Sequence, residues 1–387
     1  MRFAKLLVST LAATTLLASA LAQQLPQLDA VQPGHRLVVN SSAVAFEYAD
    51  RSHLITAAAG DTTLVFVTEP LNQQIAVLDR FTGTEVGQVS APLGGFLLPF
   101  SIRVPRPGRL VVLDSGGFPN PKVPSIARVY DYDYQWNPFT HVFTATLARS
   151  VSFAGFPLVF AEDVEATSSG LYVVAESVIG ALWVIQADGS IIPGVFPSGG
   201  GPIPALGPCT LPPARIGGIP YVIAGNFAPG VLSLTSHNGQ LFFSSPCTGG
   251  LSRIPIASLT DSSRTPEQRA QDIVAVSPEP ADMVETFEGI TANPFDLDDP
   301  WIYACDSFHL RLIRIHSQSG VREVVASDPL LFNFPAKVQF LPPVFGLSPM
   351  VVASDQEHRL AAINAALTAD ITQPPWIVTK ILVFGQY

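Results

Sequence analysis

A short unit that recurs six times constrains this sequence more than any other feature. Each copy holds an apolar segment ending in an acidic residue or Ser, and a further apolar segment follows after a gap. The first kind occupies residues 64–69, 110–114, 171–176, 241–245, 302–306 and 350–355. The second kind occupies residues 74–78, 127–130, 181–185, 251–254, 310–315 and 360–363. The unit recurs about every 45 to 70 residues, which is typical of propeller blades, so we predict an all-β fold, a six-bladed β-propeller.

The predicted strands are continuously apolar because neighbouring blades bury both faces of each sheet. The last apolar run, residues 376–384, is expected to complete a blade and close the ring, which removes exposed strand edges. Only 13% of residues are charged, and 35 Pro and 29 Gly suit many short strands joined by turns. One helical insert is expected at residues 264–271.

An acid recurs at the end of most of these strands, and its regularity invites a catalytic interpretation. The acids are Glu69, Asp114, Glu176, Asp306 and Asp355. A residue repeated from blade to blade usually accepts hydrogen bonds in a turn. We therefore interpret these acids as structural.

The first residues have the pattern of a secretory signal peptide. Arg2 and Lys5 supply positive charge, and an apolar run then ends in Ala-Leu-Ala at residues 20–22. We expect a signal peptide at 1–22, a single propeller domain at 23–387, and localisation in the secretory pathway or outside the cell. No later stretch reaches the roughly 18 apolar residues of a membrane span, so no membrane anchor is expected.

In the oxidising secretory pathway, cysteines can form disulfides and sequons can be glycosylated. Cys209 and Cys247 both lie in loop-like sequence and are predicted to form a disulfide, whereas Cys305 lies inside a predicted strand as a buried thiol. Asn40 begins an Asn-Ser-Ser triplet and is a predicted glycosylation site in a eukaryotic host.

The net charge of −10, with only 21 Lys and Arg, argues against nucleic acid and anionic membranes as partners. Both of those partners require a basic face on the protein. A small apolar molecule in the propeller channel is the expected partner.

Several segments resemble known propeller families. Residues 109–116, 127–131, 241–246, 251–255 and 352–359 resemble the Yellow and major royal jelly protein propellers. The wider group is similar to the SMP-30/gluconolactonase and strictosidine synthase propellers, and the resemblance covers most of residues 23–387. The overall character also resembles secreted fungal propellers that act as hetero-Diels-Alderases. These families include lactonases, other enzymes and proteins without known catalysis, so the resemblance implies the fold more than the function.

The channel entrance is the expected binding site, because the innermost strand of each blade lines the channel. Aligning the six units places the entrance at Leu54, Ser101, Glu162-Asp163, Gly230-Val231, Glu288-Gly289 and Lys337. In lactonases, the resemblance implies, this ring holds Ca²⁺ through a Glu, two Asn and an Asp. Here Glu288 and the Glu162-Asp163 pair supply carboxylates and Asn226 supplies one further oxygen, but Ser101 and Lys337 replace the other ligands. We therefore expect no metal cofactor, with Ca²⁺ as the alternative.

Candidate roles follow from the same alignment. Glu162, Asp163, Glu288 and Lys337 are the predicted catalytic residues, because they can polarise a carbonyl or quinone oxygen. The predicted substrate-binding residues are Ser101, Phe100, Phe287, Phe340 and Asn226. For the three Phe residues, core packing is the competing interpretation.

Three functions remain open at this point. The first is a metal-free enzyme of specialised metabolism, in particular a cyclase of the hetero-Diels-Alderase type. The second is a Ca²⁺-dependent hydrolase similar to gluconolactonase. The third is a non-catalytic small-molecule-binding protein of the Yellow type.

Overall fold

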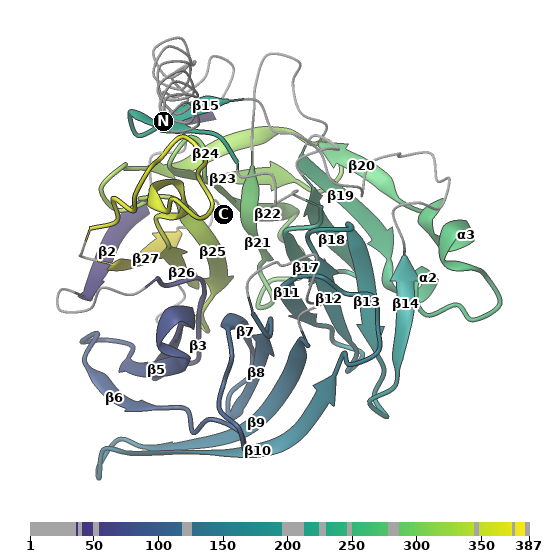
Figure 1. The fold of residues 1–387 in the computed structure, drawn as a ribbon, viewed down its shortest axis with the longest axis horizontal. Helices are drawn as coiled ribbons and strands as arrows, with labels where there is room; N and C mark the ends of the chain where they lie inside the picture. Colours follow the sequence, from purple (N-terminus) through teal and green to yellow (C-terminus); the bar gives the residue numbers. More distant parts are fainter. Residues whose placement is uncertain are drawn as a thin grey trace, which may run out of the picture.

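The computed structural model describes residues 36–37, 41–48, 54–117, 126–195, 213–223, 230–245, 250–277, 286–343, 348–373 and 376–383. Within these residues the strands form six small antiparallel sheets arranged radially around one axis (Figure 1). The prediction of an all-β, six-bladed propeller is confirmed. No helix in these residues is long and apolar enough to cross a membrane.

The first three blades each hold four antiparallel strands. In each of these blades the first strand in the chain is the innermost one, and the next three follow outward in order. Blade 1 consists of β3 (Ala58–Gly60), β4 (Leu64–Glu69), β5 (Gln74–Asp79) and β6 (Glu85–Gln88). Blade 2 consists of β7 (Pro99–Arg106), β8 (Arg109–Asp114), β9 (Arg128–Asn137) and β10 (Val142–Ser152). Blade 3 consists of β11 (Ala161–Ala166), β12 (Tyr172–Glu176), β13 (Ala181–Ile185) and β14 (Ile191–Val195).

The remaining blades follow the same plan, except that the outermost strand of blade 6, β2, comes from the N-terminal part of the chain. Blade 4 consists of β17 (Ser233–His237), β18 (Gln240–Ser245), β19 (Gly250–Pro255) and β20 (Val274–Ser277). Blade 5 consists of β21 (Phe287–Ala292), β22 (Trp301–Asp306), β23 (Arg311–His316) and β24 (Arg322–Ser327), with β1 (Arg36–Leu37) parallel to β24. Blade 6 consists of β25 (Pro335–Phe340), β26 (Ser348–Ser354), β27 (Trp376–Val383) and β2 (Ser41–Tyr48).

Blade 6 closes the ring with strands from both ends of the chain. β27 pairs with β26 on one side and with β2 on the other, so the expected closing role of residues 376–384 is confirmed for β27. The prediction of a third strand at residues 360–363 is wrong. That segment instead turns after the 3-10 helix η3 (Glu357–Arg359), and Asn364 binds the backbone of Val222.

The hydrophobic core lies between neighbouring blades. Phe66 of blade 1 meets Tyr134 of blade 2 edge to face, with ring centroids 4.9 Å apart. Tyr303 of blade 5 meets Phe340 of blade 6 in the same way at 5.0 Å. Fully burying one such side chain is worth about 1.5–3 kcal/mol, which explains why the strands are apolar on both faces.

Two of the acids at the strand ends, Asp114 and Glu176, have the structural role that their repetition predicts. The Asp114 carboxylate accepts hydrogen bonds from the backbone amides of Leu97 and Leu98 at 2.8 and 2.7 Å. The Glu176 carboxylate accepts from Phe160 N at 2.9 Å in the equivalent turn of blade 3. These two carboxylates therefore fix the turns that lead into the innermost strands of blades 2 and 3.

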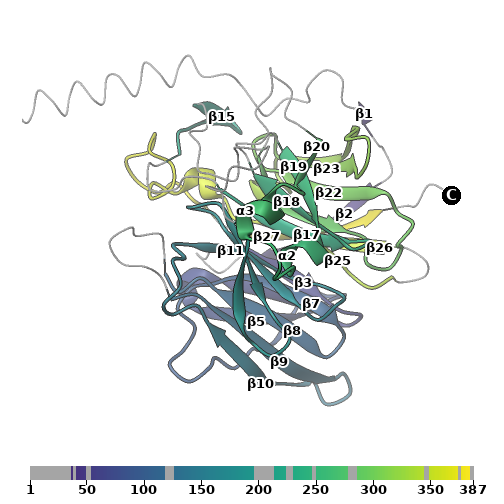
Figure 2. The ribbon, with the colours of Figure 1, turned by 90° about the vertical axis from the view of Figure 1, so that its right-hand side faces the viewer.

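The chain between blades 3 and 4 forms a small hairpin that packs on blades 5 and 6 and covers part of one face of the ring. It consists of β15 (Ala214–Ile216) and β16 (Ile219–Tyr221), and Figure 2 shows β15 beside the yellow C-terminal segment. Tyr221 packs edge to face against Phe308, with centroids 5.3 Å apart. We call this side of the ring the hairpin face, and the other side the opposite face.

Short helices complete the described structure. The 3-10 helix η1 (Pro70–Asn72) follows β4, and α2 (Ile256–Leu259) and α3 (Pro266–Ala270) lie between β19 and β20. α3 falls within the helical insert expected at residues 264–271, and a capping box of Thr265 and Gln268 satisfies its first turn.

Candidate active site

The six innermost strands begin at the hairpin face, and four of them begin with an irregularity in register. One residue is skipped between the first two paired positions of β7, β11, β21 and β25. The skipped residues are Phe100, Glu162, Glu288 and Ala336. Because such a bulge re-aims a side chain, Glu162 and Glu288 occupy equivalent special positions in blades 3 and 5.

Directly after the bulges, polar side chains meet in the middle of the channel. The Asp163 carboxylate accepts hydrogen bonds from Ser101 Oγ at 2.5 Å, from Arg103 Nη2 at 2.8 Å and from Ser233 Oγ at 3.0 Å. Burial alone raises the pKa of Asp163, but Arg103, Lys337 and the hydrogen bonds outweigh it and hold that pKa below its usual range. Asp163 is therefore an ionised anchor for three blades.

Lys337 ties blade 6 to the same network. Its Nζ donates to the backbone oxygens of Glu288 and Leu232 at 2.7 and 2.9 Å, and it lies 3.9 Å from Asp163 Oδ2. Lys337 is 3% exposed and Asp163 is fully buried, so this network is shielded from solvent.

Above this network, toward the hairpin face, lies a group of carboxyl side chains: Glu162, Glu288, Asp355 and Glu357. Burial raises the pKa of Glu162 to about 7, although Lys337 opposes the shift. Burial and then repulsion from Glu357 and Glu162 hold the pKa of Glu288 well above its usual range. We call these four residues the carboxyl cluster.

Asp355 and Glu357 are the other two members of the carboxyl cluster. Their side chains are hydrogen-bonded to each other. Burial raises both pKa values well above their usual range, helped by repulsion from Glu288 and Glu162 at Asp355 and from Asp355 and Glu162 at Glu357. Tyr221 from the hairpin is influenced by the same acids, and burial is the main cause of its raised pKa. The cluster can therefore hold protons near neutral pH and donate hydrogen bonds.

The three Phe residues predicted to bind substrate do not gather at the channel entrance. Phe100 is buried and packs edge to face on Phe160 at 5.1 Å, and Phe287 is 1% exposed in the core between blades 4 and 5. Phe340 packs on Tyr303 and lies at the far end of its strand, toward the opposite face. The structure thus brings together Ser101, Asp163 and Lys337 by direct contact, but not these three rings.

Some predicted features lie outside the described residues. These are Asn226, the Cys209–Cys247 pair, the Asn40 sequon and the signal peptide at 1–22. Cys305 is described and is a buried free thiol in β22.

The donor set does not fit the Ca²⁺ site of the lactonase pattern. Among the described residues, no three His, Cys, Asp or Glu side chains are grouped so that they could hold a metal ion. The oxygens of Asp163 are already used by Ser101, Arg103 and Ser233, and the Lys337 ammonium lies beside them. We therefore derive no step through a metal.

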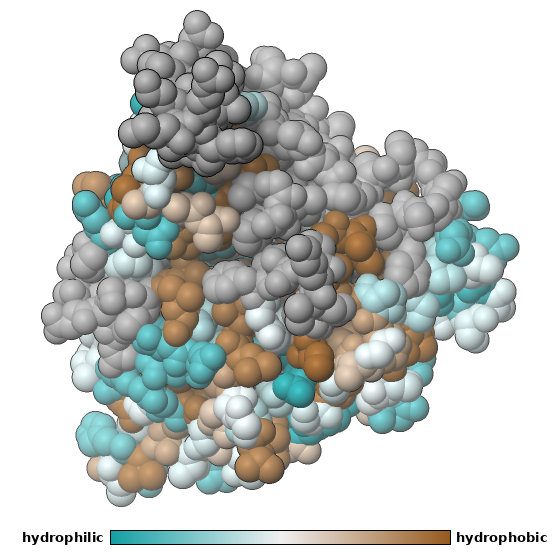
Figure 3. All heavy atoms as spheres, viewed as in Figure 1, coloured by the Kyte–Doolittle hydropathy of each residue, from teal (hydrophilic) through white to brown (hydrophobic). Residues whose placement is uncertain are grey.

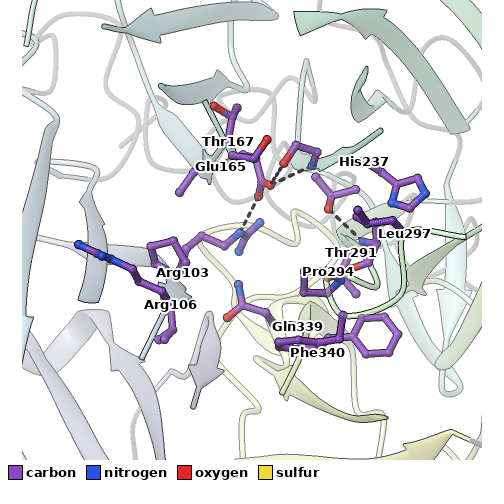
Figure 4. Close-up of a pocket in the computed structure, with 18 of the residues that line it drawn as sticks. Arg103, Arg106, Glu165, Thr167, His237, Thr291, Pro294, Leu297, Gln339 and Phe340 are labelled. Carbon is purple, nitrogen blue, oxygen red and sulfur yellow. Dashed lines mark hydrogen bonds and ion pairs between the residues drawn. The ribbon is translucent and has the colours of Figure 1, made fainter. Parts of the chain in front are cut away.

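Residues that the sequence analysis missed complete the site. Arg103 lies two positions after Ser101, and Glu165 lies two positions after Asp163. Arg103 Nε donates a hydrogen bond to Glu165 Oε2 at 3.2 Å (Figure 4). A strand places residues i and i+2 on the same face, so this period was a usable signal. Glu357 lies on η3, and no regular pattern links it to the channel.

Comparisons with known proteins agree with this fold. No protein-family model matches the sequence, and no curated protein sequence matches it significantly. A luciferin-regenerating enzyme is similar in structure, with a TM-score of 0.52, 12% sequence identity, and coverage of 89% of this chain and 96% of that one. The likeness supports the fold described here, a six-bladed propeller.

Two further structures are similar. One is a catalytically inactive virginiamycin B lyase from Staphylococcus aureus with quinupristin, with a TM-score of 0.50, 10% identity, and coverage of 89% of this chain and 100% of that one. The other is a calcium-binding regucalcin from Agrobacterium tumefaciens, with a TM-score of 0.49, 14% identity, and coverage of 86% and 92%. At 10–12% identity, the likeness to the luciferin-regenerating enzyme and to the lyase concerns the fold alone.

Proposed function

We propose that this propeller is an enzyme that acts on a small, largely apolar organic molecule at the hairpin-face mouth of its channel. The observation that supports this is the carboxyl cluster, in which Glu162 has a pKa of about 7 and Glu288 a pKa well above its usual range. A carboxyl group that keeps its proton near pH 7 can donate a hydrogen bond to a substrate oxygen. Figure 3 shows hydrophobic residues, in brown, among hydrophilic ones on this face.

The chemistry that fits best is a cycloaddition of the hetero-Diels-Alder type. A hydrogen bond from Glu162 or Glu288 to a carbonyl or quinone-methide oxygen withdraws electron density from the conjugated system. An alkene then adds across it: one C–C and one C–O σ bond form, two π bonds are consumed and the third shifts within the new ring, so no atom leaves and no oxidant is needed. Holding both partners in one pose contributes roughly 7–11 kcal/mol toward the barrier.

The other polar residues act as positioning residues in this proposal. Asp163 fixes Ser101 and Arg103, and Lys337 fixes the backbone of Glu288, so the bulge that carries the Glu288 side chain stays in place. The proposed setting is the secretory pathway, which the pattern of residues 1–22 supports.

Lactone hydrolysis is the second candidate, because a carboxyl group with a pKa of about 7 also suits a general base that activates water. A Gln in place of Glu162 distinguishes the two candidate reactions, because one needs a hydrogen-bond donor and the other needs a base. Gln keeps a hydrogen-bond donor but cannot take up a proton. Glu162→Gln should therefore retain part of a cycloaddition activity and abolish hydrolysis.

The experiment compares two reactions with the purified protein. One is addition of an alkene to an ortho-quinone methide generated in solution, and the other is hydrolysis of dihydrocoumarin. In the active assay we expect Glu162→Ala and Glu288→Ala to lower kcat/KM by about 10²–10⁴-fold with little change in melting temperature. Glu267→Gln, an exposed acid on α3, is the matched control. Turnover that survives both Ala variants would refute the assignment, and a lack of acceleration in both assays would favour a binding protein.

Chelation separates the metal-free proposal from the lactonase alternative. Activity should be unchanged after dialysis against EDTA. Loss of activity with EDTA and its return with Ca²⁺ would show that a metal is required.

A further inference from the structure

The outermost strand of blade 2, β10, is an open edge of its sheet. It pairs with β9 on one side, and in the described part of the chain no strand pairs with its other side. Figure 1 and Figure 2 both show it at the outer margin of the molecule. Every second residue of such a strand directs its backbone N–H and C=O away from the sheet, so β10 offers a row of free hydrogen-bonding groups to a further strand.

The accessible part of this edge consists of residues 142–148, which we call the edge segment. Most of its side chains are exposed, namely those of Val142, Thr144, Thr146, Leu147 and Ala148. Arg149 follows a register irregularity and instead contacts blade 3, because its Nη1 donates to Ala187 O at 3.1 Å. Its guanidinium also lies over the ring of Tyr172, 4.9 Å from the centroid. The open edge therefore ends where the contacts with blade 3 begin.

The outer strands of the other five blades carry features that hinder such pairing. β6 and β20 are only four residues long, and β14 contains Pro193. β24 contains Arg322 and Glu323 and already pairs with β1, and β2 contains Glu47. Short length, Pro and charge are devices by which proteins protect sheet edges. The edge segment contains no Pro, no Gly and no charged residue, and it belongs to a strand of 11 residues.

The edge segment is a palindrome of residue types about Ala145. Moving outward from that residue, each step meets a pair of similar side chains: Thr144 with Thr146, Phe143 with Leu147, and Val142 with Ala148. If two copies of the segment pair in antiparallel fashion about Ala145, Thr lies opposite Thr and Phe lies opposite Leu, which are favourable cross-strand pairs. A surface that is complementary to itself is what a two-fold symmetric dimer requires.

The charges next to the edge segment do not oppose this pairing. Asp133 lies beside Thr146 in the register of the blade and accepts a hydrogen bond from Arg109 Nη1 at 2.7 Å. Because the segment itself is uncharged, two copies of it bring no like charges together.

The strand is also held in place before a partner arrives. It pairs with β9 along its length, and the Phe143 ring packs edge to face on Phe66 with centroids 6.0 Å apart. A strand that is already ordered loses less conformational freedom when it pairs.

We propose that a second copy of this chain pairs with β10 in antiparallel register about Ala145, so that the two blades join into one continuous sheet across a two-fold axis. An unrelated peptide could use the same backbone groups, but it would have no need of the palindrome. One strand pair makes a small interface, so we expect a dissociation constant of roughly 1–100 µM. The interface lies at the outer rim and is independent of the proposed chemistry at the hairpin face.

Two double variants at exposed positions test both the pairing and its register. In Thr144→Lys/Thr146→Lys, the Lys/Lys variant, each new Lys lies opposite a Lys of the other copy. In Thr144→Glu/Thr146→Lys, the Glu/Lys variant, each new Glu lies opposite a Lys. Position 146 and its neighbour Asp133 are the same in both variants, so the two proteins differ only in the sign of the charge at position 144.

The measurement is sedimentation equilibrium of the full chain at pH 7 over a range of protein concentrations. We expect the Lys/Lys variant to dimerise about tenfold or more weakly than the unaltered protein, because like charges then lie directly opposite. The Glu/Lys variant should stay within about threefold of the unaltered protein. The net charge of −10 would favour the reverse order, because the Lys/Lys variant is the less negative of the two.

A cross-link gives an independent test of the register. Oxidising a mixture of Thr144→Cys and Thr146→Cys chains should give a disulfide-linked dimer, because these positions face each other about Ala145. Neither chain alone should do so, since its two new thiols would lie two residues apart along the strands, beyond the reach of a disulfide. If a charge variant does not fold, this experiment decides.

Several results would overturn the proposal. The first is an unaltered protein that stays monomeric up to millimolar concentration or forms only species larger than a dimer. The others are a dimer that both double variants weaken equally, a dimer that neither of them weakens, and a mixture of the two Cys variants that forms no cross-link. None of these results depends on turnover at the carboxyl cluster.

Discussion

Replacing Asp163 with Asn tests whether the mid-channel network stabilises the ring. Asn keeps the shape of Asp and can still bond to Ser101 and Ser233, but it leaves the buried Arg103 guanidinium without one of its two anionic partners. Breaking a buried ion pair costs about 3–5 kcal/mol. Because Glu165 still pairs with Arg103, we expect the lower end, about 3 kcal/mol, or roughly two orders of magnitude in the unfolding equilibrium.

The measurement is urea-induced unfolding at pH 7, with Asp163→Asn, Arg103→Met and the double variant compared. In the double variant the uncompensated guanidinium is gone, so we expect its loss of stability to be about 2 kcal/mol smaller than the sum of the two single losses. Asp298→Asn, at an exposed position, should change the free energy of unfolding by less than about 0.5 kcal/mol. A single-variant cost below about 1 kcal/mol, or strict additivity, would refute the reasoning.

Three further predictions concern the cluster, the packing of blades and the closure of the ring. The folded state holds the Glu162 proton up to about pH 7, while the unfolded carboxyl ionises near 4.5, so the free energy of unfolding should fall as pH rises between these values. Glu162→Gln should reduce that fall in pH-dependent urea titrations, and an unchanged profile would contradict the shift. Gly289→Ala would place a Cβ 2.4 Å from Ala336 O, so its melting temperature should drop by several degrees, whereas Gly87→Ala meets a side chain at 3.4 Å and should change little in calorimetry. Deleting residues 41–48 exposes one edge of β27, so the protein should aggregate in light scattering, and a monomeric product with unchanged stability would show that β2 is dispensable.

The fold was predictable because a repeated unit leaves few alternatives. Residues 64–69 and 110–114 coincide with β4 and closely with β8, since these central strands are apolar on both faces. β2 was not predictable as part of blade 6, because its partner lies more than 300 residues away and nothing local in its sequence marks the pairing. Residues 360–363 look like a strand but pack beneath the hairpin instead, where Asn364 holds Val222.

The site was predictable in its positions and less so in its chemistry. Aligning the repeats located Glu162 and Glu288 in their innermost strands, because both blades carry the same bulge. The sequence analysis stopped at the entrance and so missed Arg103, whose side chain neutralises Asp163. It also missed Glu357, which a turn after β26 carries into the channel, and which helps to keep the proton on Glu288.

The joining of β2 to β27 has a consequence for how the protein is made. The ribosome releases the residues of β2 before those of blades 1 to 5 and the residues of β27 after them, so blade 6 cannot assemble until all the other blades have been synthesised. Contacts between such distant segments raise the contact order and slow folding. Until β27 is available, the five earlier blades form an open arc, and β2 at the start of this arc has no strand to pair with. We therefore expect chaperones to bind nascent chains at this strand. The rate at which β2 pairs with β27 sets how long an incompletely folded molecule can associate with other chains through its unpaired strand edge.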